Sequence, residues 1–144
     1  MEPAIVSIFV ATSAYLFVKM FSNSIVQGYC RFRYKSFKYR EDEPFFRGKV
    51  DPEKPQPELL MRADAAWRND LENIPMFIVA ALCAMFSGVP EQAFCWICLL
   101  YCVARTLHTL ALLASLQPWR FIFFFIGMSC TSALFIWSLH LQGW

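Results

Sequence analysis

The stretch Arg68-Asn69-Asp70-Leu71-Glu72-Asn73 directly precedes an apolar run, IPMFIVAALCAMFSGV, at residues 74–89. This run has 16 residues, whereas a helix that spans a membrane needs about 20. The helix must therefore include part of the charged stretch that precedes it. We expect a spanning helix over about 60–88, with charged side chains inside the membrane.

The composition of the whole chain agrees with a membrane protein. Of its 144 residues, 58% are apolar and 17% are aromatic, which is typical of a chain built from membrane spans. Three further apolar segments cover about 4–29, 93–116 and 119–141. The net charge of +2 is too small to suggest a nucleic-acid partner. The sequence thus predicts an all-α integral membrane protein, a four-transmembrane-helix bundle forming a single membrane domain over 1–144.

Basic residues predict the orientation of this bundle. Nine Lys or Arg lie between positions 31 and 62, mostly in a charged loop over about 30–59, and none lies in the turn at 87–92. Because basic loops stay on the cytosolic side, we expect the loop, which has room for one short helix, to be cytosolic and both termini to be luminal. The first apolar run is too long for a signal peptide, so we expect it to remain in the protein.

Six cysteines are present, and Cys95-Trp96-Ile97-Cys98 has the spacing of a redox or metal pair. The pair lies in an apolar segment with no His or acidic residue beside it. Cysteine in such surroundings packs as a small apolar side chain. We therefore expect buried packing cysteines and no metal site.

Polar groups inside the membrane need partners, because an Arg or Asp at a helix centre costs about 2.5–3.5 kcal/mol to insert. Asp64, Arg68 and Glu72 recur every four residues and share one helix face. Arg105, His108 and Thr109 share a face of the next helix. In antiparallel helices both groups lie toward the cytosolic end, where we expect the ends of the first and fourth helices to bring further arginines.

Two interpretations of these charges remain open. They pair with one another or extend to lipid headgroups, which we favour for Lys19, Arg33 and Lys35. Alternatively, they bind a ligand with negative charges and an ammonium group, because arginine pairs with carboxylates through a planar fork and Glu72 can accept the ammonium. We favour the ligand for the larger set, namely Arg31, Arg68, Asn69, Glu72, Arg105, His108 and Arg120.

Several motifs resemble one known family, the membrane-associated proteins of eicosanoid and glutathione metabolism (MAPEG). RNDLEN at 68–73 and RTLHT at 105–109 are similar to signatures of its microsomal glutathione transferase and microsomal prostaglandin E synthase subgroup. GYCRFRYKSF at 28–37 and QPWR at 117–120 resemble its first loop and its entry into the fourth helix.

The resemblance implies a homotrimer in the endoplasmic reticulum or another endomembrane, with glutathione held between neighbouring subunits near the cytosolic face. Arg120 matches the arginine beside the glutathione sulfur, which makes it the candidate catalytic residue. A hydrophobic small-molecule or lipid substrate would lie against Leu112, Phe121 and Phe124. The positions that match glutathione-holding residues are Arg31, Arg68, Asn69, Glu72, His108 and Arg120.

This sequence departs from the family pattern at defined positions. Trp67 replaces a histidine, and Pro75 lies one residue before the usual proline. Leu112, Phe121 and Phe124 replace residues with hydroxyl groups. These changes favour a transferase or peroxidase that activates the glutathione thiolate toward hydrophobic electrophiles. The alternatives are a prostaglandin endoperoxide isomerase, a non-catalytic lipid-binding scaffold like the five-lipoxygenase-activating protein, and a small transporter.

Overall fold

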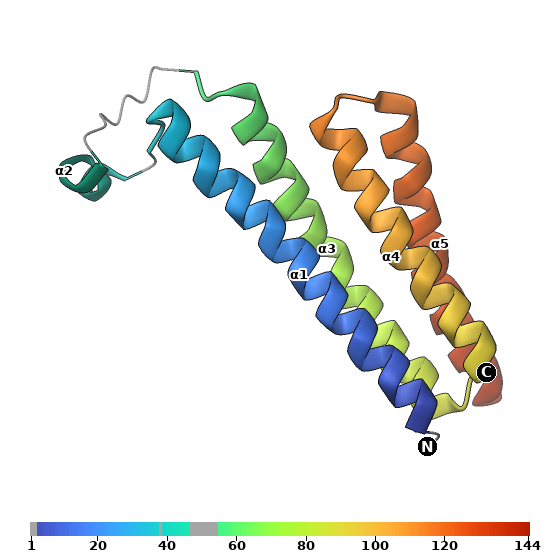
Figure 1. Cartoon of the computed structure of the whole chain (residues 1–144). Helices are drawn as coiled ribbons and strands as arrows, with labels where there is room; N and C mark the ends of the chain where they lie inside the picture. The colour runs from blue at the N-terminus through green and yellow to red at the C-terminus, as the bar shows by residue number, and fades with distance from the viewer. Residues whose placement is uncertain (1–2, 38, 47–54) are drawn as a thin grey trace.

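Four long helices make up most of the molecule (Figure 1). The computed structural model describes residues 3–37, 39–46 and 55–144. Each long helix is long and apolar enough to cross a membrane, so the predicted all-α four-helix membrane bundle is confirmed. The four are α1 (Pro3–Tyr34), α3 (Glu58–Ser87), α4 (Glu91–Leu113) and α5 (Gln117–Leu141).

The predicted loop begins later than expected, because α1 continues to Tyr34 rather than ending near residue 29. A 3₁₀-helix at Arg40–Asp42 runs directly into the short helix α2, Glu43–Phe46. The short helix expected in this loop is therefore present. Positions 38 and 47–54 of the predicted loop lie outside the described residues.

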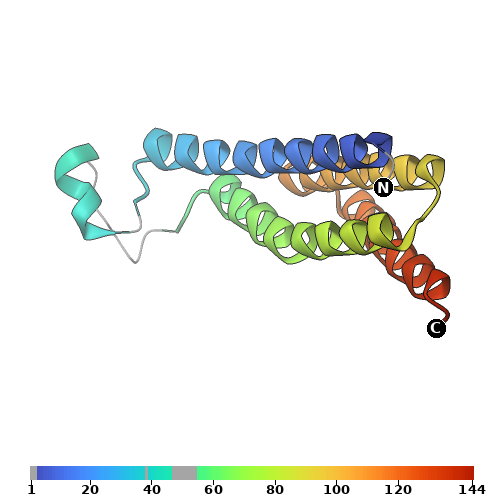
Figure 2. The same cartoon turned by 90° about the horizontal axis from the view of Figure 1, so that it is seen from below.

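The central pair of the bundle is α3 and α4, each of which packs against the other three long helices. Figures 1 and 2 show α1 beside α3, and α5 beside α4. The N-terminus and C-terminus lie together at one end (Figure 1). At the other end α1 and α4 stop and α3 and α5 begin. We call this the basic end, because Arg31 and Arg120 lie there.

Glycine and proline determine how α3 ends and bends. Gly88 caps the helix with a φ of 81°, and its N–H donates to the carbonyl oxygen of Ala84. This left-handed conformation suits glycine and turns the chain into α4 within three residues, 88–90. Pro75 lies inside α3 and removes a backbone donor, which accounts for the change in direction of α3 in Figure 2.

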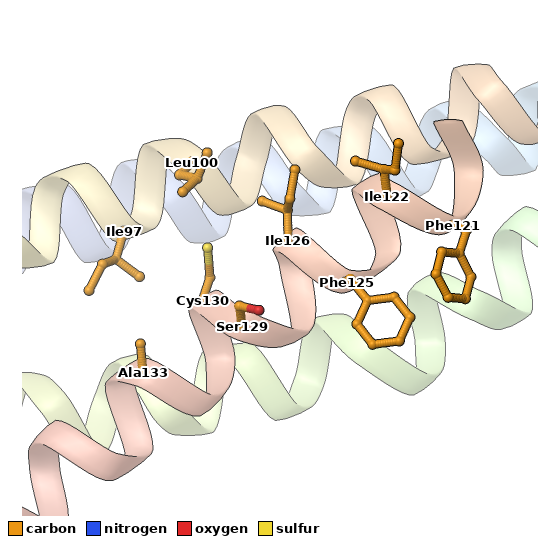
Figure 3. Close-up of a pocket in the computed structure, with 9 residues that line it drawn as sticks. All are labelled: Ile97, Leu100, Phe121, Ile122, Phe125, Ile126, Ser129, Cys130 and Ala133. Carbon is orange, nitrogen blue, oxygen red and sulfur yellow. The ribbon is translucent and has the colours of Figure 1, made fainter. Parts of the chain in front are cut away.

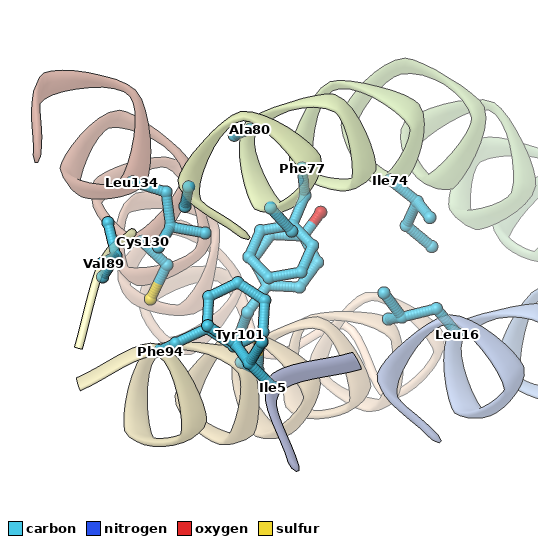
Figure 4. Close-up of a cluster of buried hydrophobic side chains, with 13 residues drawn as sticks. Ile5, Leu16, Ile74, Phe77, Ala80, Val89, Phe94, Tyr101, Cys130 and Leu134 are labelled. Atoms are coloured by element: carbon cyan, nitrogen blue, oxygen red, sulfur yellow. The ribbon is translucent and has the colours of Figure 1, made fainter. Parts of the chain in front are cut away.

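The apolar core depends on close approach between helices. The rings of Phe77 and Tyr101 stack with centroids 3.6 Å apart and planes 7° from parallel (Figure 4). Gly127 lets α5 approach them, because a Cβ there would lie 3.4 Å from Cδ of Arg105 and 3.7 Å from Cε2 of Tyr101. Small residues at helix interfaces let helices approach closely within membranes.

All six cysteines are free thiols. Cys98 is buried in the core, as predicted, whereas Cys95 lies exposed on the outer surface of α4. The packing prediction is therefore wrong for Cys95. Residues three apart on a helix are about 60° apart around its axis, so a pair at the edge of the packed face has one member inside and one outside.

We expect Gly127→Val to destabilise the bundle by about 1–3 kcal/mol, because the added carbons press on Tyr101 and Arg105. Gly28→Val is the matched control, since no heavy atom lies within 4 Å of the position of its Cβ. The measurement is the midpoint of thermal unfolding in one detergent. Equal shifts in the two variants would contradict the close approach of α5.

Candidate functional site

A buried ionic network joins three helices at Asp70, whose side chain is 0% exposed. Lys19 on α1 donates to both carboxylate oxygens at 2.5 Å, and Asn23 donates to Oδ2 at 2.6 Å. Nη2 of Arg105 on α4 donates to Oδ1 at 3.0 Å. Lys19 also donates to Oγ1 of Thr109 at 2.6 Å. The lysine thus pairs inside the bundle and does not extend toward a headgroup.

The network contains two cations and one carboxylate, so it carries an excess positive charge. Lys19, Asp70 and Arg105 are all nearly or fully buried. Charges are weakly screened in such surroundings, and the excess favours an anion nearby. Asn69 lies beside this excess positive charge, because Nη2 of Arg105 also donates to Oδ1 of Asn69.

Asn69 lines a cavity of about 350 Å³ between α3, α4 and α5, which we call the basic-end cavity. His108 lies in its wall, 3% exposed, and Nδ1 of this ring has no hydrogen-bond partner within 3–37, 39–46 and 55–144. Six of the residues predicted from the sequence lie together here. The complete lining is Ala65, Asn69, His108, Leu112, Gln117, Arg120, Phe121 and Phe124.

Arg31 and Arg68 lie apart from this group, in the wall of a second cavity of about 270 Å³. Arg68 is 73% exposed and pairs with Asp64 one turn earlier. Glu72 lies one turn beyond Arg68 and is also exposed. Successive helical residues are about 100° apart, so Arg68 points away from Asp70 to the outer face of α3. One chain thus carries two separate groups of predicted site residues.

Arg105 was predicted to contact the ligand, and the structure places it behind the cavity. Its side chain is 1% exposed, and its partners are Asn69 and Asp70. Nε of Arg105 is buried and has no partner among the described residues. Ligand contact by Arg105 stays a prediction.

An apolar groove of about 570 Å³ lies on the outer surface of α4 and α5 (Figure 3). Ile97 and Leu100 come from α4, and the remaining side chains from α5. Phe121 lines both this groove and the basic-end cavity. A polar cavity and an apolar groove therefore share one wall.

Asn23, Asp70 and Gln117 are polar residues of this region that were not among the predicted site residues. Asp70 lies on the stripe of α3 that includes Ala66 and Ile74, which are buried. The signal in the sequence was a single acidic residue within an otherwise apolar stripe, which indicated that Asp70 forms the centre of a polar network. Gln117 begins α5 and gave no such signal.

Four helices long and apolar enough to cross a membrane fit an integral membrane protein. Its polar cavity lies at the basic end, next to an apolar groove. The chain belongs to the MAPEG family, whose model matches residues 9–140. It is 32% identical over 111 residues to prostaglandin E synthase from Mus musculus, covering 76% of this chain and 71% of that protein. Prostaglandin E synthase from Rattus norvegicus matches with the same identity and coverage.

We expect Asp70→Asn to destabilise the folded protein by about 3–5 kcal/mol, because it leaves Lys19 and Arg105 buried without their counter-ion. Asp64→Asn is the control, since it removes an exposed pair within one helix and such pairs contribute little. Thermal unfolding of both purified variants in detergent measures the difference. Similar midpoints would show that Asp70 does not hold the helices together.

Proposed function

We propose that this chain is a glutathione-dependent membrane enzyme that acts on hydrophobic electrophiles, by conjugation or by peroxide reduction. One observation carries the proposal: Phe121 lines both the cavity that contains Arg120 and the apolar groove. A charged reagent and an apolar molecule would meet there. Membership of the MAPEG family supports the choice of glutathione as the reagent.

The residues of the basic-end cavity fit a peptide that carries negative charge. Arg120, Asn69 and Gln117 offer N–H donors, and His108 offers a ring nitrogen without a partner among the described residues. The excess positive charge of the network behind Asn69 adds attraction for an anion. When bound, glutathione supplies a thiol whose ionised form is the nucleophile or the reductant.

Arg120 is the proposed catalytic residue. A guanidinium beside a thiol favours the thiolate, and Arg120 would hold that negative charge in the cavity. The side chain is half-buried and stands in the first turn of α5. Backbone N–H groups at the start of a helix also favour negative charge.

The complete site is proposed to lie between copies of the chain in a homotrimer. Arg68 and Glu72 are exposed on the outer face of a membrane-spanning helix, where uncovered charges are costly. The group with Arg31 and Arg68 is separate from the group with Arg120. A closed ring of identical copies would place one group of each copy beside the other group of its neighbour.

The basic end is proposed to face the cytosol from an endomembrane such as the endoplasmic reticulum. The connection between α1 and α3 carries six of the 13 Lys and Arg residues, and the connection between α3 and α4 carries none. This asymmetry supports a cytosolic basic end, where a water-soluble peptide would enter the cavity.

Prostaglandin endoperoxide isomerisation is the second candidate, because both reported relatives are named prostaglandin E synthase. That reaction needs positioned donors around a developing alkoxide. Leu112, Phe121 and Phe124 supply no hydroxyl groups to the cavity. Conjugation needs only a thiolate and an apolar wall, so the lining favours the transferase or peroxidase.

We expect the wild-type protein to conjugate a chloronitrobenzene readily and to isomerise the endoperoxide slowly. Arg120→Leu should lower conjugation about 100-fold or more while still binding glutathione in calorimetry. Phe124→Tyr, which adds one oxygen, should raise isomerisation. Efficient isomerisation by the wild type would show that the absent hydroxyls do not matter. Unchanged conjugation in Arg120→Leu would remove Arg120 from the mechanism.

Coexpression of two inactive variants tests the shared site. Arg68→Ala and Arg120→Leu each disable a different group of residues. If one site takes one group from each of two neighbours, an equal mixture should regain about a quarter of the wild-type activity, because one arrangement in four is intact. In the control, the two variants are purified separately as stable oligomers and mixed only afterwards. No recovery on coexpression would place each site within one chain.

A further inference from the structure

The carboxamide of Asn69 lies between the buried network and the basic-end cavity. Nη2 of Arg105 donates to Oδ1 of Asn69. A guanidinium has N–H donors and no acceptor, so the atom of Asn69 that faces it must be the oxygen. No hydrogen bond involving Nδ2 of Asn69 is present in the part of the chain that the structure describes. The N–H donors of this side chain are therefore available to the cavity.

Arg105 has little freedom to move away from Asn69. The guanidinium is also held by Asp70 at 3.0 Å, and Asp70 is fixed by Lys19 and Asn23. The arginine is 1% exposed, and α5 packs against its stem at Gly127. The orientation of one amide is thus determined by a chain of contacts that begins on α1.

We propose that Arg105 is a positioning residue, which acts through Asn69 and not on the ligand. It holds the amide so that the cavity presents N–H donors at this point. The group bound there is then a hydrogen-bond acceptor, a carboxylate or carbonyl oxygen of the peptide. A group that can only donate would leave these half-buried donors unpaired, which costs binding energy. This inference rests on the proposed function and assigns one contact within that site.

A double-mutant cycle tests whether Arg105 acts through Asn69. The variants are Arg105→Met, Asn69→Ala and the combination, and Arg105→Met leaves the Lys19–Asp70 pair intact. Calorimetry with glutathione on detergent-purified protein should show each single variant weakened about tenfold or more, with the combination no weaker than either. Arg105→Met should still lower the midpoint of thermal unfolding, both in the wild-type protein and in Asn69→Ala. Additive losses of affinity would overturn the proposal, because independent contributions add.

Asn69→Asp tests the donor without disturbing the network. The new carboxylate still accepts from Arg105, with an added opposite charge, but it presents oxygen to the cavity in place of N–H. We expect the thermal midpoint to stay at or above that of the wild type and glutathione binding to be lost. Binding at wild-type affinity would overturn the proposal. This variant decides the question even if Arg105→Met does not fold.

Thr109→Val is the matched control within the same network. It removes a contact of Lys19 and leaves the line from Asp70 through Arg105 to Asn69 intact. Its affinity for glutathione should stay within about twofold of the wild type, because Lys19 keeps its hydrogen bonds to both oxygens of Asp70. A tenfold loss would show that any weakening of the network reduces affinity, and would overturn the positioning role. Wild-type protein that fails to bind glutathione would instead remove the proposed function.

Discussion

A single carboxylate inside an apolar bundle constrains the rest of this molecule. Asp70 receives hydrogen bonds from Lys19 and Asn23 on one helix and from Arg105 on another. Apolar contacts alone allow helices to rotate and slide with small changes in energy. A buried charge has few acceptable partners, and breaking its pair costs several kcal/mol. The carboxylate therefore defines the relative depth and rotation of α1, α3 and α4.

The network also connects the interior of the bundle to its candidate site. It holds one more cation than anions. One of these cations, Arg105, donates a hydrogen bond to Asn69, which lines the cavity. The same contacts thus hold helices together and set the polarity of the cavity. α5 contributes the facing wall, with Arg120 and Phe121, and its approach depends on the absence of a side chain at Gly127.

Hydropathy and charge were sufficient to predict the four spans and the basic end, because both depend on composition along one segment. Helical spacing also predicted which residues share a face. It did not predict partners on other helices, since these depend on the depth and rotation of a second helix. Arg68 pairs with Asp64 on its own helix, as their shared face indicated. Arg105 lies behind the cavity and not in its wall, because the neighbouring acid that holds it belongs to another helix.

The distance along the chain between these partners matters during biosynthesis. Lys19 and Asp70 are 51 residues apart, and Lys19 and Thr109 are 90 apart. Because synthesis proceeds from the N-terminus, α1 reaches the membrane before α3, which carries its counter-ion. A lone lysine at the centre of a helix costs about 2.5–3.5 kcal/mol on insertion scales. The apolar remainder of α1 must therefore offset this cost until α3 brings Asp70 beside the lysine.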